Sequence, residues 1–374
     1  MRGVGVNSWS IRDSKEECLT SPCQTISATT PSSPCPHPQA AAEGEGPLAD
    51  GFGRVHKYLR ISVTDRCNLR CLYCMPRTGI VHRGHEEILR LDEITRLSRL
   101  FARMGINKIR LTGGEPLVRS GIEHLVRELA GIDGVATLGM TTNGVFLGDR
   151  AASLRKAGLT HLNISLDTLR PERFVQVASG DCLDKVFVGI NSALAAGFVP
   201  VKLNVVVIGG INDDEVLDFA ELTKERPISV RFIEFMPFHA NDWGRDRFVP
   251  TADLRSALEE RFRLVPVVLP AGYPAPVARE FHIDGHQGSI GFIASMSNHF
   301  CSGCNRLRLT ADGALKSCLF YPAETSLRDP MRAGADDTAI MELIRSTLLG
   351  KYSAHPPLES LGGTQTQSMI EIGG

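Results

Sequence analysis

Hydrophobic and polar positions follow a regular rhythm from residue 58 onward. Short runs rich in Val, Ile, Leu and Thr predict strands at 58–64, 108–112, 137–142, 161–166, 201–208 and 230–235. Between them, apolar residues at helical spacing predict helices near 92–104, 120–130, 149–157, 184–196 and 213–225. Six strands separated by helices indicate a parallel sheet with right-handed crossovers, covered on both faces.

The alternation indicates an α/β fold, an incomplete (β/α)6 TIM-type barrel, because the six units end near residue 236. We assign residues 51–240 to this partial barrel, whose chemistry is expected at the C-terminal ends of its strands. Beyond 240 the rhythm changes to helices at 251–260 and 336–349 and strands at 263–268 and 289–295. We expect residues 241–374 to form a C-terminal layer over the barrel mouth.

Residues 1–50 differ from the rest of the chain. They are rich in Pro, Ser, Thr, Ala and Gly and poor in large apolar residues, which predicts a disordered extension. Two interpretations stay open: a spacer or a targeting segment. Arg2 and Arg12 suit a transit peptide, whereas Asp13, Glu16 and Glu17 do not.

Composition narrows the class of protein. Hydrophobic residues make up 43% and charged residues 22%, as in globular proteins. The net charge of -1 argues against nucleic acid as the main partner. The sequence holds no run of 18 apolar residues, so no membrane span is predicted.

The ten cysteines include two tight triplets, which favour metal sites in a reducing compartment over disulfides. Cys67, Cys71 and Cys74 form C-x3-C-x2-C directly after the first strand. Three thiolates can hold a [4Fe–4S] cluster and leave one iron open, whereas the alternative, a structural zinc site, favours four ligands. The remaining cysteines, Cys18, Cys23, Cys35 and Cys182, are given no role.

Cys301, Cys304 and Cys318 form the second triplet, C-x2-C-x13-C. A second [4Fe–4S] cluster with an open iron is our preferred interpretation, because an open iron could bind a substrate nitrogen or oxygen. Half of a zinc ribbon is the alternative. His299 is a conceivable fourth ligand by its spacing.

Basic residues recur near the starts and ends of the predicted strands. They are Arg60, Lys108, Arg110, Lys202, Arg231, Arg306 and Arg308. Converging guanidinium groups in a barrel mouth would require an anionic ligand, and their forked geometry suits phosphate oxygens. We therefore expect a polyphosphate substrate, although the sequence lacks a GxxxxGK[ST] loop.

The segment RISVTDRCNLRCLYCMP, with LTGGEPLVR one strand later, resembles the signature of radical S-adenosylmethionine (SAM) enzymes. The resemblance implies that the open iron chelates SAM and that electron transfer releases a 5′-deoxyadenosyl radical. It also implies SAM contacts at Tyr73, Gly114, Glu115, Ser165 and Met236.

Further motifs narrow the resemblance. GMTTNG, LNISLDTL, VKLNVVV, VRFIEFMPF, HFCSGCNRLRLTADGALKSCLF and the final IGG occur in the order found in the GTP 3′,8-cyclase family of molybdenum cofactor biosynthesis, closest to its eukaryotic form. This resemblance covers residues 51–374. It implies a lyase that forms (8S)-3′,8-cyclo-7,8-dihydroguanosine 5′-triphosphate from GTP with SAM and two [4Fe–4S] clusters. Another radical SAM enzyme with an auxiliary cluster is the nearest alternative, and a zinc-binding interaction module is the non-enzyme alternative.

The family resemblance also implies roles for individual residues. Contacts to GTP fall on Arg60, Arg110, Thr141, Lys202, Arg306, Leu307 and Arg308, supported by Lys108 and Arg231. Gly373 and Gly374 would enter the active site and act in catalysis. The second cluster would bind the guanine base.

The expected partners come from the family alone. They are a second copy of the chain in a homodimer, an external electron donor, and cyclic pyranopterin monophosphate synthase as the next enzyme. The mitochondrial matrix is the expected compartment, with the cytoplasm as the alternative. Two segments depart from the family pattern, 176–186 and 350–368, and neither is expected to touch a cluster ligand.

Overall fold

The computed structural model describes residues 46–76, 78–239, 241–268, 277–323, 325–357, 361 and 367–373. The interpretations of the N-terminal extension therefore fall almost entirely outside the described residues. The first buried residue of the described chain is Leu48, slightly before residue 51, where the barrel region was expected to begin. None of the helices in the described part of the chain is long and apolar enough to cross a membrane.

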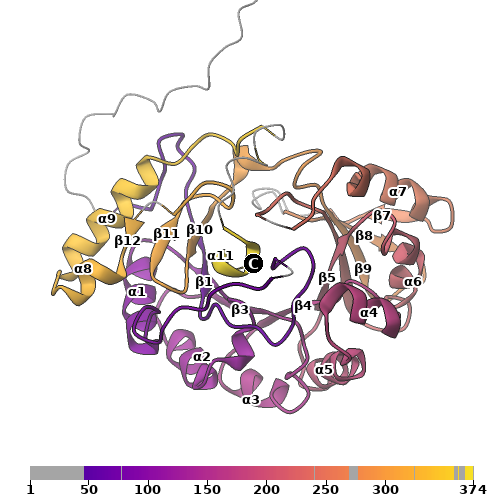
Figure 1. Ribbon diagram of the computed structural model, residues 1–374, viewed down its shortest axis with the longest axis horizontal. Coiled ribbons are helices and arrows are strands. Elements are labelled where there is room, and N and C mark those ends of the chain that lie inside the picture. The colour runs from indigo at the N-terminus through magenta and orange to yellow at the C-terminus, as the bar shows by residue number, and fades with distance from the viewer. Residues whose placement is uncertain are drawn as a thin grey trace, which may run out of the picture. The chain divides into compact units, whose positions relative to one another are not determined.

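The six predicted barrel strands are confirmed. They are β1 (Tyr58–Ser62), β2 (Lys108–Thr112), β3 (Thr137–Thr142), β4 (His161–Ser165), β5 (Val201–Val207) and β6 (Ile228–Glu234). Each pairs in parallel with the next, in chain order. The strands curve around a central space and the helices lie outside them (Figure 1).

The covering helices bury one apolar stripe each. They are α1 (Leu91–Arg103), α2 (Ile122–Ala130), α3 (Ala151–Lys156), α4 (Pro171–Ala178), α5 (Leu183–Ala195) and α6 (Val216–Glu221). In α1 the stripe consists of Ile94, Leu97, Leu100 and Phe101, all at most 1% exposed. The sequence did not predict α4, and it predicted α6 too long, because residues 213–215 form a 3-10 turn.

The C-terminal region corrects the expected architecture. Its strands are β7 (Leu264–Pro266), β8 (Arg279–Ile283), β9 (Ser289–Ile293), β10 (Arg306–Leu309), β11 (Ala314–Lys316) and β12 (Thr325–Ser326). They do not form a separate layer, because β10 pairs in parallel with β1 and β9 with β6. The result is one 12-stranded sheet, β12-β11-β10-β1-β2-β3-β4-β5-β6-β9-β8-β7.

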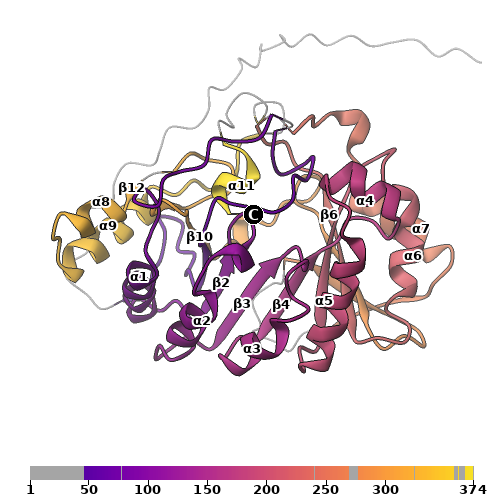
Figure 2. The same cartoon turned by 60° about the horizontal axis from the view of Figure 1, so that its bottom comes forward.

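The other C-terminal helices are α7 (Thr251–Glu259), α8 (Arg328–Arg332), α9 (Asp337–Leu349) and α11 (Met369–Ile372). Figures 1 and 2 both show α11 at the mouth of the curved sheet. The expectation that C-terminal residues cover the mouth therefore holds for α11, although not for the strands.

Strand alternation explains why the interior of the barrel is polar. In β1, Leu59 and Ile61 are fully buried in the hydrophobic core beneath the helices. Tyr58 and Arg60 point the other way, because successive side chains of a strand face opposite sides. Both line the central cavity.

Candidate active site

A cavity of about 910 Å³ occupies the barrel mouth. It is lined by six cysteines, the two predicted triplets, and by residues from β1–β6, β10 and the segment after α9. No other cysteine of the described chain lines it. The structure therefore brings together two groups that are more than 200 positions apart in the sequence.

The first triplet lies in the loop that follows β1. Within it, the amides of Cys74 and Met75 both donate to the carbonyl of Cys71. The Leu69 amide lies 3.4 Å from Cys67 Sγ, and Asn143 Nδ2 lies 3.8 Å from it. Burial raises the pKa of Cys67 to about 11 and also raises that of Cys71 and Cys74.

The loop after β2 packs directly against the first triplet. A Cβ on Gly114 would lie 2.3 Å from the carbonyl oxygen of Arg66 and 3.1 Å from Cys67 Cβ, so only glycine fits there. The Gly114 amide donates to Thr64 O and the Glu115 amide to Arg66 O. This sequence motif therefore fixes the position of the cysteine loop.

Glu115 lies beneath the site rather than in it. The carboxylate is fully buried and accepts from the Leu117 amide, the Thr142 hydroxyl and the Asn143 amide at 2.7–2.9 Å. It does not line the cavity. Burial raises its pKa to about 7. The predicted SAM contact is thus a buried residue that ties β2 to β3.

The other predicted SAM contacts line the cavity: Tyr73, Gly114, Ser165 and Met236. The Tyr73 hydroxyl donates to Asp167 Oδ2 at 2.8 Å, which fixes its ring beside the first triplet. Ser165 ends β4. Met236 packs on a hydrophobic cluster that also contacts Cys74 and Cys318.

The second triplet lies at the turn η4 (Cys301–Gly303) and around β10. Its surroundings are cationic. Lys351 Nζ lies 3.7 Å from Cys304 Sγ, and Arg54 donates to the carbonyl of Cys301 at 2.8 Å. Burial acts to raise the pKa of Cys304, but Lys351 and Arg306 hold it below its ordinary value.

Lys351 corrects one expectation. It belongs to the segment 350–368, which was not expected to touch a cluster ligand, yet its ammonium contacts Cys304. The histidine considered as a fourth ligand lies nearby. One ligand atom each of His299, Cys301 and His355 lie within 4.8 Å of one another.

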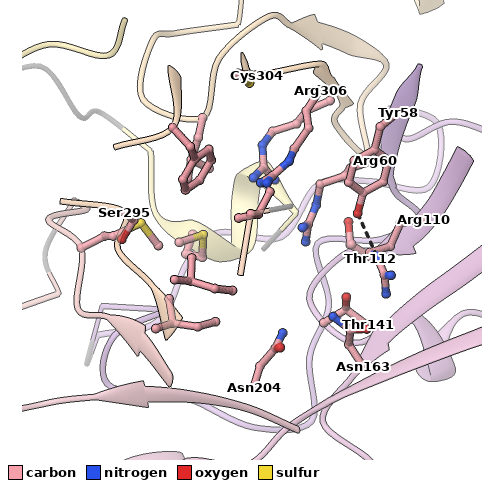
Figure 3. A pocket seen from close by; sticks show the side chains of 18 of the residues that line it. Tyr58, Arg60, Arg110, Thr112, Thr141, Asn163, Asn204, Ser295, Cys304 and Arg306 are labelled. Atoms are coloured by element: carbon pink, nitrogen blue, oxygen red, sulfur yellow. Dashed lines mark hydrogen bonds between the residues drawn. The ribbon is translucent and has the colours of Figure 1, made fainter. Parts of the chain in front are cut away.

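The cations are arranged in two rows by strand register. Tyr58 on β1 pairs with Arg306 on β10 and Lys108 on β2, while Arg60 pairs with Arg308 and Arg110 on the same strands. Figure 3 shows the guanidinium groups of Arg60 and Arg306 pointing into the cavity. Lys202 and Arg231, on β5 and β6, extend the cationic wall. Burial, followed by Arg231, lowers the pKa of Lys202 to about 8.

Tyr58 lies in the middle of these cations. Its hydroxyl accepts from Arg110 Nε at 2.8 Å (Figure 3), and Lys108 Nζ lies 4.8 Å from the centre of its ring. Burial acts to raise its pKa, but Arg110, Arg60, Arg306 and Lys108 lower it to about 7.

Several buried polar atoms of the wall have no hydrogen-bond partner among the described residues. They are Thr141 Oγ1, Asn163 Oδ1, Asn204 Oδ1, Arg231 Nε and Ser295 Oγ. An unsatisfied buried polar group costs about 1–3 kcal/mol. Because all five residues line the cavity, a polar ligand that satisfies these atoms is the expected occupant.

Gly373 reaches the ends of β1 and β2. It is buried, with a left-handed φ of 77°, and a Cβ there would lie 2.6 Å from Ser62 Cβ and 3.0 Å from Thr112 Oγ1. The glycine is therefore required by conformation and by space. Gly374 lies outside the described residues.

Comparison with known proteins agrees with this geometry. The Radical SAM superfamily matches residues 61–223, and Molybdenum Cofactor Synthesis C matches residues 228–356. "GTP 3′,8-cyclase" of Moorella thermoacetica is 48% identical over 87% of this chain and 100% of its own length. "GTP 3′,8-cyclase, mitochondrial" of Arabidopsis thaliana is 48% identical over 87% of this chain and 83% of its own length.

The chain belongs to the GTP 3′,8-cyclase family. Human "Molybdenum cofactor biosynthesis protein 1" is 45% identical over 87% of the chain, which spans 51% of that protein. Among solved structures, Streptococcus suis SuiB superimposes with a TM-score of 0.55 at 14% identity, covering 83% of this chain and 75% of SuiB. That likeness confirms the radical SAM fold.

GTP 3′,8-cyclases use SAM and two [4Fe–4S] clusters, and the residues of this chain fit both clusters. Each triplet presents three free thiols to the cavity. Burial raises the pKa of each thiol in the first triplet, and a bound iron cation would stabilise the thiolates against that effect.

The predicted site of this cyclase-family chain is brought together almost completely. Among the described residues of that site, Glu115, Gly373 and Leu307 do not line the cavity. Leu307 is fully buried in the hydrophobic core and faces away from it. It sits between two inward residues, Arg306 and Arg308, so strand alternation explains its position.

Sequence reasoning gave no role to several cavity residues, among them Tyr58, Asn163, Asn204 and Lys351. The first three carried a signal. Tyr58 is two positions before Arg60, Asn163 two before Ser165, and Asn204 two after Lys202, so each shares a strand face with a predicted site residue. Lys351 follows a helix and carried no such signal.

Proposed function

We propose that this chain converts GTP to (8S)-3′,8-cyclo-7,8-dihydroguanosine 5′-triphosphate, the first step of molybdenum cofactor biosynthesis. The observation that carries the proposal is one cavity lined by both cysteine triplets and by ten lysine and arginine side chains. A radical source alone would require only the first triplet. The second triplet and the cations call for a substrate that is both anionic and able to ligate iron.

The cations are proposed to bind the triphosphate of GTP. Arg308, Arg60 and Arg110 lie side by side across three strands, which suits a chain of phosphates. Arg306 and Lys108 form the neighbouring row, and Lys202 and Arg231 continue around the wall. Binding of a polyanion offsets the repulsion among these buried charges.

SAM is proposed to bind between the first triplet and the ends of β4–β6. Gly114 allows the backbone to come close to the methionine moiety, while Tyr73, Ser165 and Met236 surround the nucleoside. Glu115 holds the loop from below, through Thr142 and Asn143. When bound, SAM and the cluster on Cys67, Cys71 and Cys74 supply a 5′-deoxyadenosyl radical that removes a hydrogen atom from C3′ of GTP.

The protein itself contributes position and exclusion of water. Thr141, at the end of β3, is proposed to contact the substrate between the two triplets. Gly373 closes the mouth against Ser62 and Thr112, so that C3′ and C8 are held together away from other hydrogen donors. Cys301, Cys304 and Cys318 would hold the second cluster, which is proposed to bind the guanine base.

Partners and compartment are further parts of the proposal. The product requires one electron and one proton in addition to C3′–C8 bond formation, so an external electron donor is needed. We also propose a homodimer, delivery of the product to cyclic pyranopterin monophosphate synthase, and residence in the mitochondrial matrix. The name of the Arabidopsis relative supports the mitochondrial assignment.

The test is anaerobic incubation of the reconstituted protein with GTP, SAM and a reductant. We expect both 5′-deoxyadenosine and the cyclised nucleotide. Cleavage of SAM without any cyclised nucleotide would contradict the substrate assignment. About four irons per chain instead of about eight would contradict the second cluster.

A further inference from the structure

Lys351 is a buried cation with a fully specified set of contacts. Its side chain follows α9 and is 5% exposed. The ammonium lies 2.8 Å from His56 Nε2, 3.3 Å from the carbonyl oxygen of Arg306 and 3.7 Å from Cys304 Sγ. These three acceptors match the three hydrogens of a lysine ammonium.

His56 orients that ammonium toward the sulfur. Its Nδ1 lies 2.8 Å from the carbonyl oxygen of Arg54, which can only accept, so Nδ1 carries the hydrogen and Nε2 accepts from Lys351. Burial and then Lys351 lower the pKa of His56 to about 4, which keeps the ring neutral. Arg54 is itself held by Asp50 at 2.6 Å.

This arrangement has no counterpart at the first triplet in the described chain. There the Leu69 amide and Asn143 Nδ2 contact Cys67, and the Tyr73 hydroxyl contacts Cys71. The neighbouring carboxylates are those of Asp167 and Glu115. A full positive charge close to one thiolate favours the more negative, reduced state of a cluster.

We propose that Lys351 is a positioning residue for the auxiliary cluster, the one on Cys301, Cys304 and Cys318. Its hydrogen bond to Cys304 raises the reduction potential of that cluster. The inference rests on the proposed function, because it requires a [4Fe–4S] cluster at the second triplet. Through this hydrogen bond, one chain would give its two clusters different reduction potentials.

The test uses the full chain with Cys67, Cys71 and Cys74 each replaced by Ser, so that the auxiliary cluster is the sole cluster. In an EPR-monitored redox titration, Lys351→Met should lower the midpoint potential of the auxiliary cluster. Lys351→Arg keeps the positive charge, so its midpoint potential should stay close to that of the background protein. Lys156→Met, the same change at an exposed lysine of α3, is the matched control and should leave it unchanged. An unchanged midpoint in Lys351→Met with about four irons bound would overturn the proposal.

A second measurement needs no substitution at Lys351. In this background labelled with ¹⁵N at the lysine ε position, the reduced cluster should show a ¹⁵N hyperfine coupling. Absence of the coupling would overturn the proposal even if Lys351→Met loses its cluster. Neither readout uses GTP, so a failure of the cyclase assignment would leave both results interpretable. Absence of iron in the background protein would instead contradict the proposed function.

Discussion

The two cysteine triplets line one cavity, but the charges around them are opposite. Beside Cys67, Cys71 and Cys74 lie buried carboxylates. Beside Cys304 lie Lys351 and Arg306, which lower its pKa, whereas burial raises the pKa of Cys301 as it does in the first triplet. The same three ligands are thus embedded in two different electrostatic fields.

The difference in charge around the two triplets matches the difference in charge between SAM and GTP. SAM carries a sulfonium cation, so an environment with carboxylates suits it. GTP carries several negative charges, so fixed cations suit it and also offset the thiolates of the second triplet. The two triplets are joined by one hydrophobic cluster that contacts both Cys74 and Cys318. The division of the cavity is therefore electrostatic rather than a matter of separate domains.

Removing one ligand from either triplet should give the largest effects and divide the chemistry in two. Cys71→Ser should abolish SAM cleavage and cyclisation, because the radical source is lost. Cys318→Ser should abolish cyclisation but retain SAM cleavage. Iron analysis and chromatographic detection of 5′-deoxyadenosine and the nucleotide product check both variants. Loss of SAM cleavage in Cys318→Ser, with the first cluster intact, would show that the two triplets are not separable.

Gly373→Ala tests the element that closes over both halves of the cavity. The new Cβ would meet Ser62 at 2.6 Å and would force a residue other than glycine into a left-handed conformation. Displacements of about 1 Å in an active site cost about 100-fold in rate, so cyclisation should fall by about that factor. SAM cleavage should persist.

The matched control for Gly373→Ala is Gly131→Ala, at the end of α2. There the nearest atom to a new Cβ lies at an ordinary 3.6 Å and φ is negative. This variant should cyclise GTP normally. Normal turnover by Gly373→Ala would show that α11 is not part of the active site.

The sequence was sufficient for the barrel and for most site residues, because both depend on local patterns. The period of two along β1 and β2 placed Arg60 and Arg110 on one face, and the helical stripes predicted α1 and α2 within two residues. The pairing of β10 with β1 could not be predicted in this way. It joins strands about 250 residues apart, and no local pattern encodes such a contact.

The same limit explains the errors around the second triplet. Lys351 reaches Cys304 only because the chain after α9 returns to β10, and His56 reaches Lys351 only because β1 lies beside β10. Leu307 was assigned to the substrate by the family resemblance, and strand alternation turns its side chain into the core. The surroundings of Cys304 were thus harder to predict than those of the first triplet.

Arg308→Met tests whether the cationic half is specific for the triphosphate. Arg308 is buried beside Arg60, and a charge-assisted hydrogen bond contributes about 1.5–3 kcal/mol. The KM for GTP should therefore rise about 10- to 100-fold, while the KM for SAM should not change. Arg263→Met, at a side chain that is 81% exposed, is the control and should bind GTP as the parent does. An equal loss for both substrates would refute the electrostatic division.

Tyr58→Phe should give the smallest effect. It tests the cationic half of the cavity through the pH dependence of GTP binding. Arg110, Arg60, Arg306 and Lys108 lower the pKa of Tyr58 to about 7 although burial acts to raise it. As the pH rises through 7, the hydroxyl ionises, cancels one positive charge among the cations and weakens binding of the triphosphate. The KM for GTP should rise a few-fold between about pH 6 and 8 in the parent, and this rise should be absent in Tyr58→Phe.

Stability should respond to pH in the opposite direction. Because the pKa of Tyr58 in the folded protein lies below its ordinary value of 10.0, ionisation stabilises the substrate-free fold. This contribution grows as the pH rises from about 7 to 10 and is lost as the pH falls through 7. As the pH rises, the parent should therefore gain Tm relative to Tyr58→Phe, while it loses GTP affinity relative to that variant. If neither the KM for GTP nor the Tm of the parent changed with pH in this window, Tyr58 would have to stay protonated. The positive charges of the cavity would then be neutralised by the substrate alone.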